Sequence, residues 1–386
     1  MWHGVGAYRL PKLRPIQFLS SPASKVPIDA WQKNSKEPDV TRLNSLTALR
    51  AIAATTVIFF HLMSPTGTRF GEFGVDIFFV LSGFVIAMVI DGKQISAREF
   101  LMGRLTRIVP VYWLMTIALF VAVSVRPDLV NSTTASIPNL LKSLFFIPYR
   151  KENGLIHPML FVGWSLNYEL LFYMISGAVL IMFRRYRLAS ISAVLLVVFA
   201  VASEMPFDEV WVEFLSLARS LEFALGIAAW CIWKRDYRIP HQLAAVGVPT
   251  LYCGMAYVEW IGITDYALLR SGIPCFLLLL CATSLEAWFA NVGVMRVMIF
   301  LGNASYATYL SHSFVVEAAR KLLPVYLHGF EPTSPLGVAL VLVCALLVGA
   351  LIYCFVDRPT QRLVRNLTLR RAARLRIASS DGPQQA

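Results

Sequence analysis

Charged residues are scarce in this chain, and the signature motifs of several large enzyme classes are missing. Asp, Glu, Lys and Arg make up 15% of the 386 residues, whereas apolar residues make up 57%. A soluble domain is about 25% charged, so this composition indicates a membrane protein. The sequence has no Walker A loop and no GxGxxG, HExxH or GxSxG pattern. These absences argue against an ATP-driven pump, a redox enzyme and an ordinary serine hydrolase.

Cysteine usage points away from disulfides and metal sites. No two cysteines have CxxC or metal-ligand spacing, and all lie in or beside apolar runs: Cys231, Cys253, Cys275, Cys281, Cys344 and Cys354. We expect them to be small core residues, and we expect no bound metal. The chain opens without the apolar core of a signal peptide. Residues 1–42 are therefore expected to form a basic, partly disordered cytoplasmic tail.

Long apolar runs organise the rest of the chain. A membrane-spanning helix needs about 17–25 apolar residues, and ten such segments can be drawn: 46–63, 73–91, 109–125, 162–183, 188–203, 211–233, 241–260, 271–289, 298–319 and 336–356. The predicted fold is all-α, a polytopic transmembrane helix bundle of about ten spans over residues 43–357. A basic cytoplasmic tail is expected at 358–386.

Basic residues gather on alternate connections between these segments. They cluster at 93–107, 184–187 and 234–238, whereas the turn at 204–209 is acidic. By the positive-inside rule, both termini are expected in the cytoplasm. The net charge of +12 is then explained by topology and by contacts with lipid headgroups, without nucleic acid.

Arg50 and His61 lie eleven residues apart in the first apolar segment. Intramembrane charges are rare because inserting one at a helix centre costs about 2.5–3.5 kcal/mol. At about 100° per residue, eleven residues return to the same helix face about 16 Å further along the axis. The pair predicts a polar groove with Arg50 toward the cytoplasm and His61 toward the outer face. Alternatively, Arg50 reaches the cytoplasmic headgroups and His61 caps the outer end of the span.

An acid deep in another span is the natural partner for His61. Glu169 lies several residues into its apolar segment, one turn before Tyr173. A buried carboxylate must be paired, protonated or hydrated. We predict that Glu169 contacts His61 and sets the tautomer of the imidazole, as carboxylates do in triad-like sites.

Four residues are candidates for substrate binding: Asp76, Trp164, Asn167 and Tyr168. Asp76 begins an apolar span, and Ser82-Gly83 further along offers a notch for another backbone or an acyl chain. Asp76 can instead simply stabilise a helix N-terminus, and Trp164 can instead be an anchor at the membrane interface.

Two further groups of polar residues predict contacts that stabilise the fold. Arg219 and Glu222, three residues apart, predict an internal ion pair. Ser305, Tyr309 and His312 recur at helical spacing and predict a polar stripe, for which hydrogen bonds between helices are a sufficient explanation.

A basic amphipathic segment precedes the third span. Residues 98–109 place Arg104 and Arg107 opposite an apolar face, which predicts an interfacial helix that breaks at or near Pro110.

Six segments of the chain together resemble the acyltransferase 3 family, over about residues 43–356. They occur in the family's order: LTALRAIAATTVIFFH, FGVDIFFVLSGFVI, FLMGRLTRIVPVYW, GWSLNYELLFY, RSLEFALGI and LGNASYATYLSH. The wording GWSLNYE resembles most the branch that O-acetylates exopolysaccharides.

The resemblance implies roles for individual residues. Arg50 and His61 match the family's essential arginine and histidine, which are separated by ten residues. Arg104 and Arg107 match its basic pair, and Glu169 matches the acid of its WSL-type motif. The implied catalytic residues are therefore His61, Glu169 and Arg50, and the implied cofactor-binding residues are Arg104, Arg107 and Arg50.

The resemblance also implies a reaction and its setting. The expected enzyme is an O-acyltransferase in the inner membrane of a bacterium, with acetyl-CoA as donor. The expected acceptor is a hydroxyl of a carbohydrate or glycolipid, and polysaccharide biosynthesis proteins are expected partners. His61, with an ordinary pKa of about 6.5, is suited to take the hydroxyl proton.

Two alternatives remain open from the sequence. A transporter of sugars or lipid-linked oligosaccharides also fits many spans with buried charges, although it predicts paired broken helices in two related halves. The other alternative is a non-catalytic membrane subunit or receptor that binds glycan.

Overall fold

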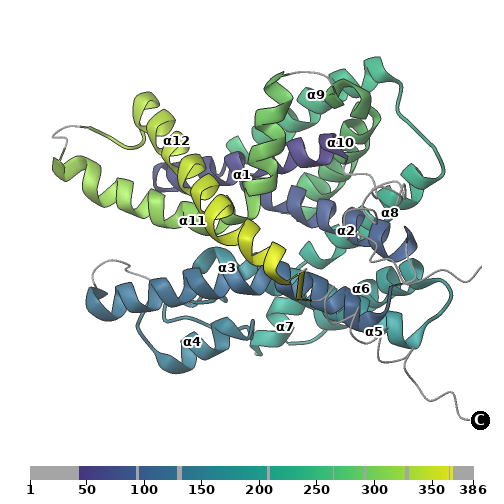
Figure 1. Cartoon of the computed structure of the whole chain (residues 1–386), viewed down its shortest axis with the longest axis horizontal. Helices are drawn as coiled ribbons and strands as arrows, with labels where there is room; N and C mark the ends of the chain where they lie inside the picture. The colour runs from purple at the N-terminus through teal and green to yellow at the C-terminus, as the bar shows by residue number, and fades with distance from the viewer. Residues whose placement is uncertain are drawn as a thin grey trace, which may run out of the picture. The chain divides into compact units, whose positions relative to one another are not determined.

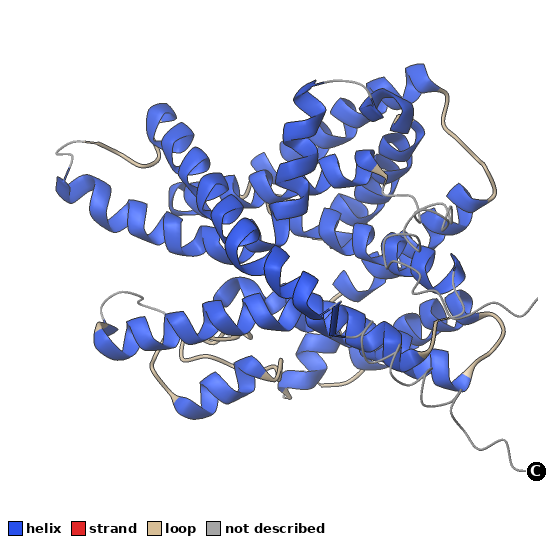
Figure 2. Cartoon of the chain, viewed as in Figure 1, coloured by secondary structure: helices blue, strands red, loops and turns tan. Residues whose placement is uncertain are grey.

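The chain folds into α-helices wherever its structure is described (Figure 2). The computed structural model describes residues 43–92, 95–127, 133–206, 209–263, 265–290, 293–326, 330–364 and 366–367. No strand occurs in these ranges. The tail predicted at 1–42 lies outside the described residues, as does the tail predicted at 358–386 from residue 368 onward.

Twelve α-helices and several shorter helical turns follow one another along the described chain. The α-helices are α1 (Asn44–Met63), α2 (Gly74–Gly92), α3 (Ala97–Val125), α4 (Ile137–Leu144), α5 (Trp164–Met182), α6 (Arg187–Ser203), α7 (Val210–Leu215), α8 (Arg219–Lys234), α9 (His241–Trp260), α10 (Ile273–Ser284), α11 (Gly293–Tyr326) and α12 (Pro335–Ile352). The shorter helical turns are η2 (Ser64–Thr66), η4 (Phe161–Gly163), η5 (Leu268–Gly272), η6 (Glu286–Ala290) and η7 (Tyr353–Asp357).

Each of the ten predicted spans contains helix, because a backbone in lipid must satisfy its own hydrogen bonds. Among the described residues, six helical stretches are long and apolar enough to cross a membrane: Asn44–Thr66, Gly74–Gly92, Ala97–Val125, Phe161–Met182, Val210–Lys234 and Pro335–Val364. Arg187–Ser203 and Leu268–Ser284 are apolar but shorter. The protein is thus a multi-pass helical membrane protein, and the count of ten crossings stays a prediction.

The helix break expected at Pro110 is absent. α3 runs unbroken through Pro110, and it starts at a capping box in which Ser96 and Glu99 satisfy each other's backbone N–H groups. A proline inside a helix removes one backbone hydrogen bond, which a long helix can tolerate. Arg104 and Arg107 therefore lie on the same continuous helix as the apolar segment that follows, and the predicted break at Pro110 is wrong.

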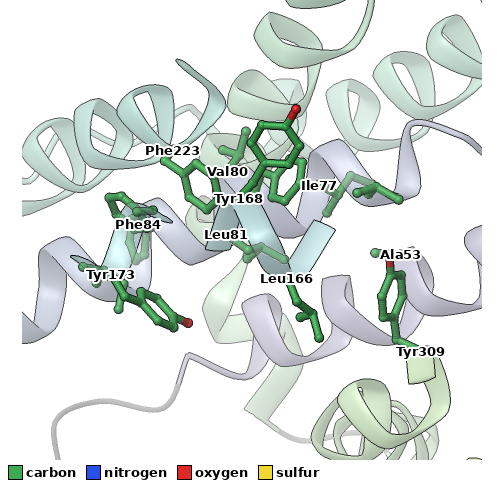
Figure 3. Packing of buried hydrophobic residues seen from close by; sticks show 14 of the residues in the cluster. Ala53, Ile77, Val80, Leu81, Phe84, Leu166, Tyr168, Tyr173, Phe223 and Tyr309 are labelled. Atoms are coloured by element: carbon green, nitrogen blue, oxygen red, sulfur yellow. The ribbon is translucent and has the colours of Figure 1, made fainter. Parts of the chain in front are cut away.

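α2 packs closely against α8 (Figure 1). A Cβ atom on Gly83 would press into the backbone carbonyl of Phe223, and one on Gly226 would press into that of Val80. The notch predicted at Ser82-Gly83 is therefore filled by another helix backbone. Figure 3 shows Val80 and Phe84 of α2 in the buried core beside Phe223 of α8 and Tyr168 of α5.

α1 packs along α11, and α11 packs along α12 (Figure 1). Gly302 of α11 meets the backbone of Thr47 on α1, so these helices also approach closely near the start of α1. There, the carboxylate of Glu286 in η6 accepts hydrogen bonds from the N–H groups of Asn44 and Ser45. This packing holds Arg50 and His61 of α1 against α11.

Candidate active site

A first cavity lies between α1, α2, α3, α5 and α11. It brings together polar side chains from distant parts of the chain: Arg50, Ser82, Arg104, Arg107, Ser165, Glu169, Tyr173, Ser305, Tyr306 and Tyr309. Apolar residues complete the wall, including Val75, Phe78 and Phe79 of α2. Arg50, Arg104, Arg107 and Glu169, all predicted site residues, thus line one space.

Three guanidinium groups make this cavity cationic. Arg50 interacts electrostatically with Arg107 and Glu169, and Arg104 interacts with Tyr173 and Glu169. Among the described lining residues, Glu169 is the acidic one. Three arginines facing one carboxylate favour an anionic ligand, and their planar donor groups suit phosphate oxygens.

Glu169 is held in place by neutral donors from two helices. Tyr173, one turn along α5, donates its hydroxyl proton to Glu169 Oε1. Ser82 Oγ of α2 donates to the same oxygen at 3.2 Å. Two hydrogen bonds from different helices thus fix the position of this side chain among the arginines.

His61 lies elsewhere, on the wall of a second cavity. This cavity is also lined by Ser64, Leu119, Thr133, Met159, Leu160, Phe161, Ser313, Phe314, Val316, Glu317 and Arg320. The His61 ring meets the Phe161 ring edge to face at 4.8 Å between centroids. It stacks on the His312 ring at 5.1 Å.

The predicted contact between Glu169 and His61 is therefore wrong. In the predicted span that carries Glu169, the residue whose ring contacts His61 is Phe161 of η4. Glu169 comes eight residues later, which is about 12 Å further along a helix. That displacement brings Glu169 to the level of Arg50, whose charge it offsets.

A line of rings runs from His61 toward the first cavity. His61 stacks on His312, and the His312 ring lies 5.8 Å from that of Tyr309. Tyr309 lines the first cavity, and its hydroxyl pairs with Ser165 Oγ at 2.8 Å. Tyr309 and His312 therefore stand between the two cavities.

The tautomer of His312 follows from its partner. Its Nδ1 lies 2.6 Å from the backbone carbonyl of Tyr309, and a carbonyl can only accept, so Nδ1 carries the proton. The ring is fully buried, and its Nε2 has no partner among the described residues.

The four predicted substrate-binding residues line neither cavity. Asp76 is 1% exposed and pairs with Arg219 at 2.8 Å, and the Arg219 guanidinium lies 4.8 Å from the centroid of the Trp164 ring. Tyr168 donates to the carbonyl of Phe214, and Asn167 is buried beside it on α5. Asp76, Trp164 and Tyr168 thus make contacts between helices.

In place of the predicted ion pair between Arg219 and Glu222, Arg219 pairs with carboxylates of other segments. Arg219 reaches Glu72 at 3.0 Å as well as Asp76, whereas both carboxyl oxygens of Glu222 have no hydrogen-bond partner among the described residues. Arg219 therefore ties α8 to α2 and to the connection that precedes α2.

The wall of the second cavity is partly built by the connection between α3 and α5. Lys151 is buried there, and its Nζ donates to Thr133 Oγ1 and to the carbonyl of Met159. Burial lowers the pKa of Lys151 to about 8. Burial and the charge of Lys151 lower the pKa of nearby His157 to about 4, so this imidazole is neutral at physiological pH.

Three residues in or beside the second cavity are not among the predicted site residues. The sequence predicts His312 only as part of a polar stripe, and Glu317 and Arg320 lie at or beyond the end of the segment 298–319. The signal was the spacing of Glu317 and Arg320, since residues three apart lie on one face of a helix, and this helix runs on to Tyr326.

Comparison with known families decides the identity. A family model described as "Acyltransferase domain", that of acyltransferase 3, matches residues 43–354. The chain belongs to the acyltransferase 3 family. It is therefore an acyltransferase, as the six segments of the sequence predict, and the matched range contains both cavities.

Several characterised proteins are similar over most of the chain. The exopolysaccharide production protein ExoZ of Rhizobium meliloti is 32% identical over 309 residues, which cover 78% of this chain and 94% of ExoZ. Acyltransferase MdmB of Streptomyces mycarofaciens is 27% identical, covering 85% of this chain and 94% of MdmB. The peptidoglycan O-acetyltransferase OatA of Listeria monocytogenes is 23% identical, and the match covers 73% of this chain and 50% of OatA. No solved structure matches the chain significantly.

Proposed function

We propose that this acyltransferase 3 enzyme is a membrane O-acetyltransferase that moves an acetyl group from acetyl-CoA to a hydroxyl of a carbohydrate. The acceptor would be an exopolysaccharide, a lipopolysaccharide or a lipid-linked oligosaccharide. The main observation in support is the cationic cavity lined by Arg50, Arg104 and Arg107. Arg50 lies on the same helix, α1, as His61. The O-acetyltransferase OatA and the exopolysaccharide protein ExoZ among the relatives support the same reaction.

The donor would bind in the first cavity. The three guanidinium groups would hold the phosphates of CoA by charge-assisted hydrogen bonds, and the apolar residues of α2 would line the path of its slender arm. Glu169 would keep the arginines apart and oriented in the empty cavity. Its role is thus positioning the cationic site, in place of the predicted role of orienting His61.

The chemical step would take place at His61. The acceptor hydroxyl attacks the thioester carbon while His61 removes its proton, and the C–S bond breaks to release CoA thiolate. The proton then passes from His61 to the thiolate, so the products are an acetyl ester and CoA thiol. Tyr309 stands between the cavities, so the arm reaches His61 when Tyr309 turns away from Ser165.

The proposed topology places the two ends of α1 on opposite sides of the bilayer. We propose about ten crossings in the inner membrane of a bacterium, with both termini in the cytoplasm, because basic connections alternate along the chain. Arg50 then faces the compartment that contains acetyl-CoA. Proteins of polysaccharide biosynthesis would supply the acceptor.

Purified enzyme in nanodiscs tests the proposal directly. We expect transfer of label from [¹⁴C]acetyl-CoA to polysaccharide extracted from cells that lack the gene. His61→Asn should lower the rate by about 10²–10⁴-fold, the usual contribution of general base catalysis, with acetyl-CoA still bound. His241→Asn, at the exposed start of α9, is the matched control.

Three results would overturn parts of the proposal. Full activity of His61→Asn would remove the base. Flux of the glycan through proteoliposomes without any acyl donor would favour a transporter. An acetylated His61 trapped by acid quench and found by mass spectrometry would replace direct transfer with a relay through the histidine.

A further inference from the structure

The second cavity is lined by His61 and by none of the three arginines of the first cavity. It lies at the opposite end of α1 from Arg50, on the far side of Tyr309 and His312. Its walls come from the end of α1, from α11 and from the connection between α3 and α5. A ligand in this cavity touches His61 without entering the cationic cavity.

The charges of this cavity differ from those of the first. Among the described residues that line it, Glu317 and Arg320 are the charged ones, and they pair with each other at 3.1 Å. Ser64, Thr133 and Ser313 add hydroxyl groups. A neutralised ion pair has little attraction for phosphate, whereas its donors and acceptors suit hydroxyl groups of an uncharged ligand.

Arg320 links the ion pair to His61. Its guanidinium donates to the backbone carbonyls of His61 and Leu62 at the end of α1. Its other terminal nitrogen donates to Glu317 Oε1. Because Arg320 is fixed on both sides, the Glu317 carboxylate is oriented beside His61, and its side chain remains 44% exposed.

Hydrogen bonds fix the wall of the second cavity that the connection between α3 and α5 forms. Thr133 and Met159 line the cavity, and both accept hydrogen bonds from the Lys151 ammonium, which is 6% exposed. Phe161 and Phe314 present aromatic rings, and such rings can pack against the apolar face of a sugar. Hydroxyl-binding groups and rings thus converge on one space.

We infer that the second cavity binds the acceptor carbohydrate, and that Glu317 and Arg320 hold the hydroxyl-bearing residue of that glycan beside His61. This inference rests on the proposed function. It assigns donor and acceptor to separate cavities that meet at His61. Glu317 would accept a hydrogen bond from a sugar hydroxyl next to the one that reacts.

Steady-state kinetics of Glu317→Gln tests the assignment, with [¹⁴C]acetyl-CoA and polysaccharide extracted from cells that lack the gene. We expect the KM for polysaccharide to rise at least fivefold while the KM for acetyl-CoA changes less than twofold. Glu213→Gln is the matched control because Glu213 also pairs with an arginine, Arg150, at 2.6 Å but lines neither cavity. A wild-type KM for polysaccharide in Glu317→Gln would overturn the inference.

Ser313→Trp provides a second test if Glu317→Gln unfolds. The indole would fill the cavity, so we expect transfer to polysaccharide to fall at least tenfold while acetyl-CoA binding, measured by calorimetry, stays within twofold. Undiminished transfer in this variant would overturn the acceptor assignment. Failure of the wild-type enzyme to transfer acetyl from acetyl-CoA would instead overturn the proposed function, so the two failures are distinguishable.

Discussion

At the scale of single residues, Arg104 and Arg107 show how much the position of a charge matters. Both belong to an arginine-rich segment that a sequence places at the membrane surface. In the structure they lie on α3 beside Pro110 and face a cavity that also holds Arg50. A surface arginine would bind headgroups, whereas these can bind one anionic ligand together.

Replacing Arg104 or Arg107 with Ala should weaken donor binding. A hydrogen bond to a charged group contributes about 1.5–3 kcal/mol, so the Kd for acetyl-CoA should rise about 10–150-fold. Calorimetry on protein in nanodiscs measures it. Arg98→Ala, at an exposed position on the same helix, should bind normally, and unchanged affinity in the cavity variants would remove their donor role.

Glu169→Gln should destabilise the protein even without substrate. The three arginines would lose the carboxylate that offsets their charge, although Ser82 and Tyr173 could still bond to the amide. We expect a loss of about 1.5–3 kcal/mol, because both of these bonds become about half as strong when the acceptor is a neutral amide. Thermal unfolding in detergent measures the loss. A midpoint equal to that of the wild type would show that Glu169 does not stabilise the arginines.

At the scale of elements, the crossing of α2 and α8 depends on two glycines. Gly83→Ala or Gly226→Ala would force a methyl group against the facing backbone, and overpacking of this kind costs about 1–3 kcal/mol. We expect lower thermal midpoints for both variants. Gly103→Ala is the control because a Cβ atom there meets nothing within 4 Å, and it should be neutral or stabilising.

The connection between α1 and α2 should make stability depend on pH through Glu72. Burial by itself would raise the pKa of Glu72, but the hydrogen bond from Arg69 and the charge of Arg219 lower it below 4.5. Because the folded pKa lies below the unfolded one, this stabilisation is fully present above pH 4.5. It is lost as the pH falls through the folded pKa.

Thermal unfolding of Glu72→Gln at several pH values checks this sign. Below about pH 4.5, the wild-type midpoint should fall more steeply than that of Glu72→Gln, because only the wild type loses this charge. The exposed Glu204→Gln should follow the wild type. Parallel curves for wild type and Glu72→Gln would contradict the prediction.

At the scale of the whole molecule, the proposed orientation has a direct test. Asn153 lies on the connection before α5, and Arg185 lies on the connection after it. In a cysteine-free variant, Asn153→Cys should react with an impermeant maleimide added to intact spheroplasts, and Arg185→Cys should react only after lysis. Labelling of both from one side would contradict the crossing by Phe161–Met182.

Helix positions were predictable because lipid imposes them locally. Each apolar segment must bond its own backbone, so all ten segments contain helix, and α2 and α9 match the drawn limits to within a residue. Elements whose ends depend on local details were less predictable. α3 begins at Ala97, after the capping box of Ser96 and Glu99, and α11 runs on to Tyr326, beyond the apolar segment that ends at 319.

The sequence by itself determined a helical membrane acyltransferase, the arginine and histidine on one helix, and the three arginines that make the first cavity cationic. Tertiary structure decided the partners: Glu169 with Arg50 in place of His61, His61 with His312, and Arg219 with Asp76 in place of Glu222. Spacing along one helix follows from its period. The level at which two helices meet depends on glycine contacts and connections far away in the chain, so no local pattern encodes it.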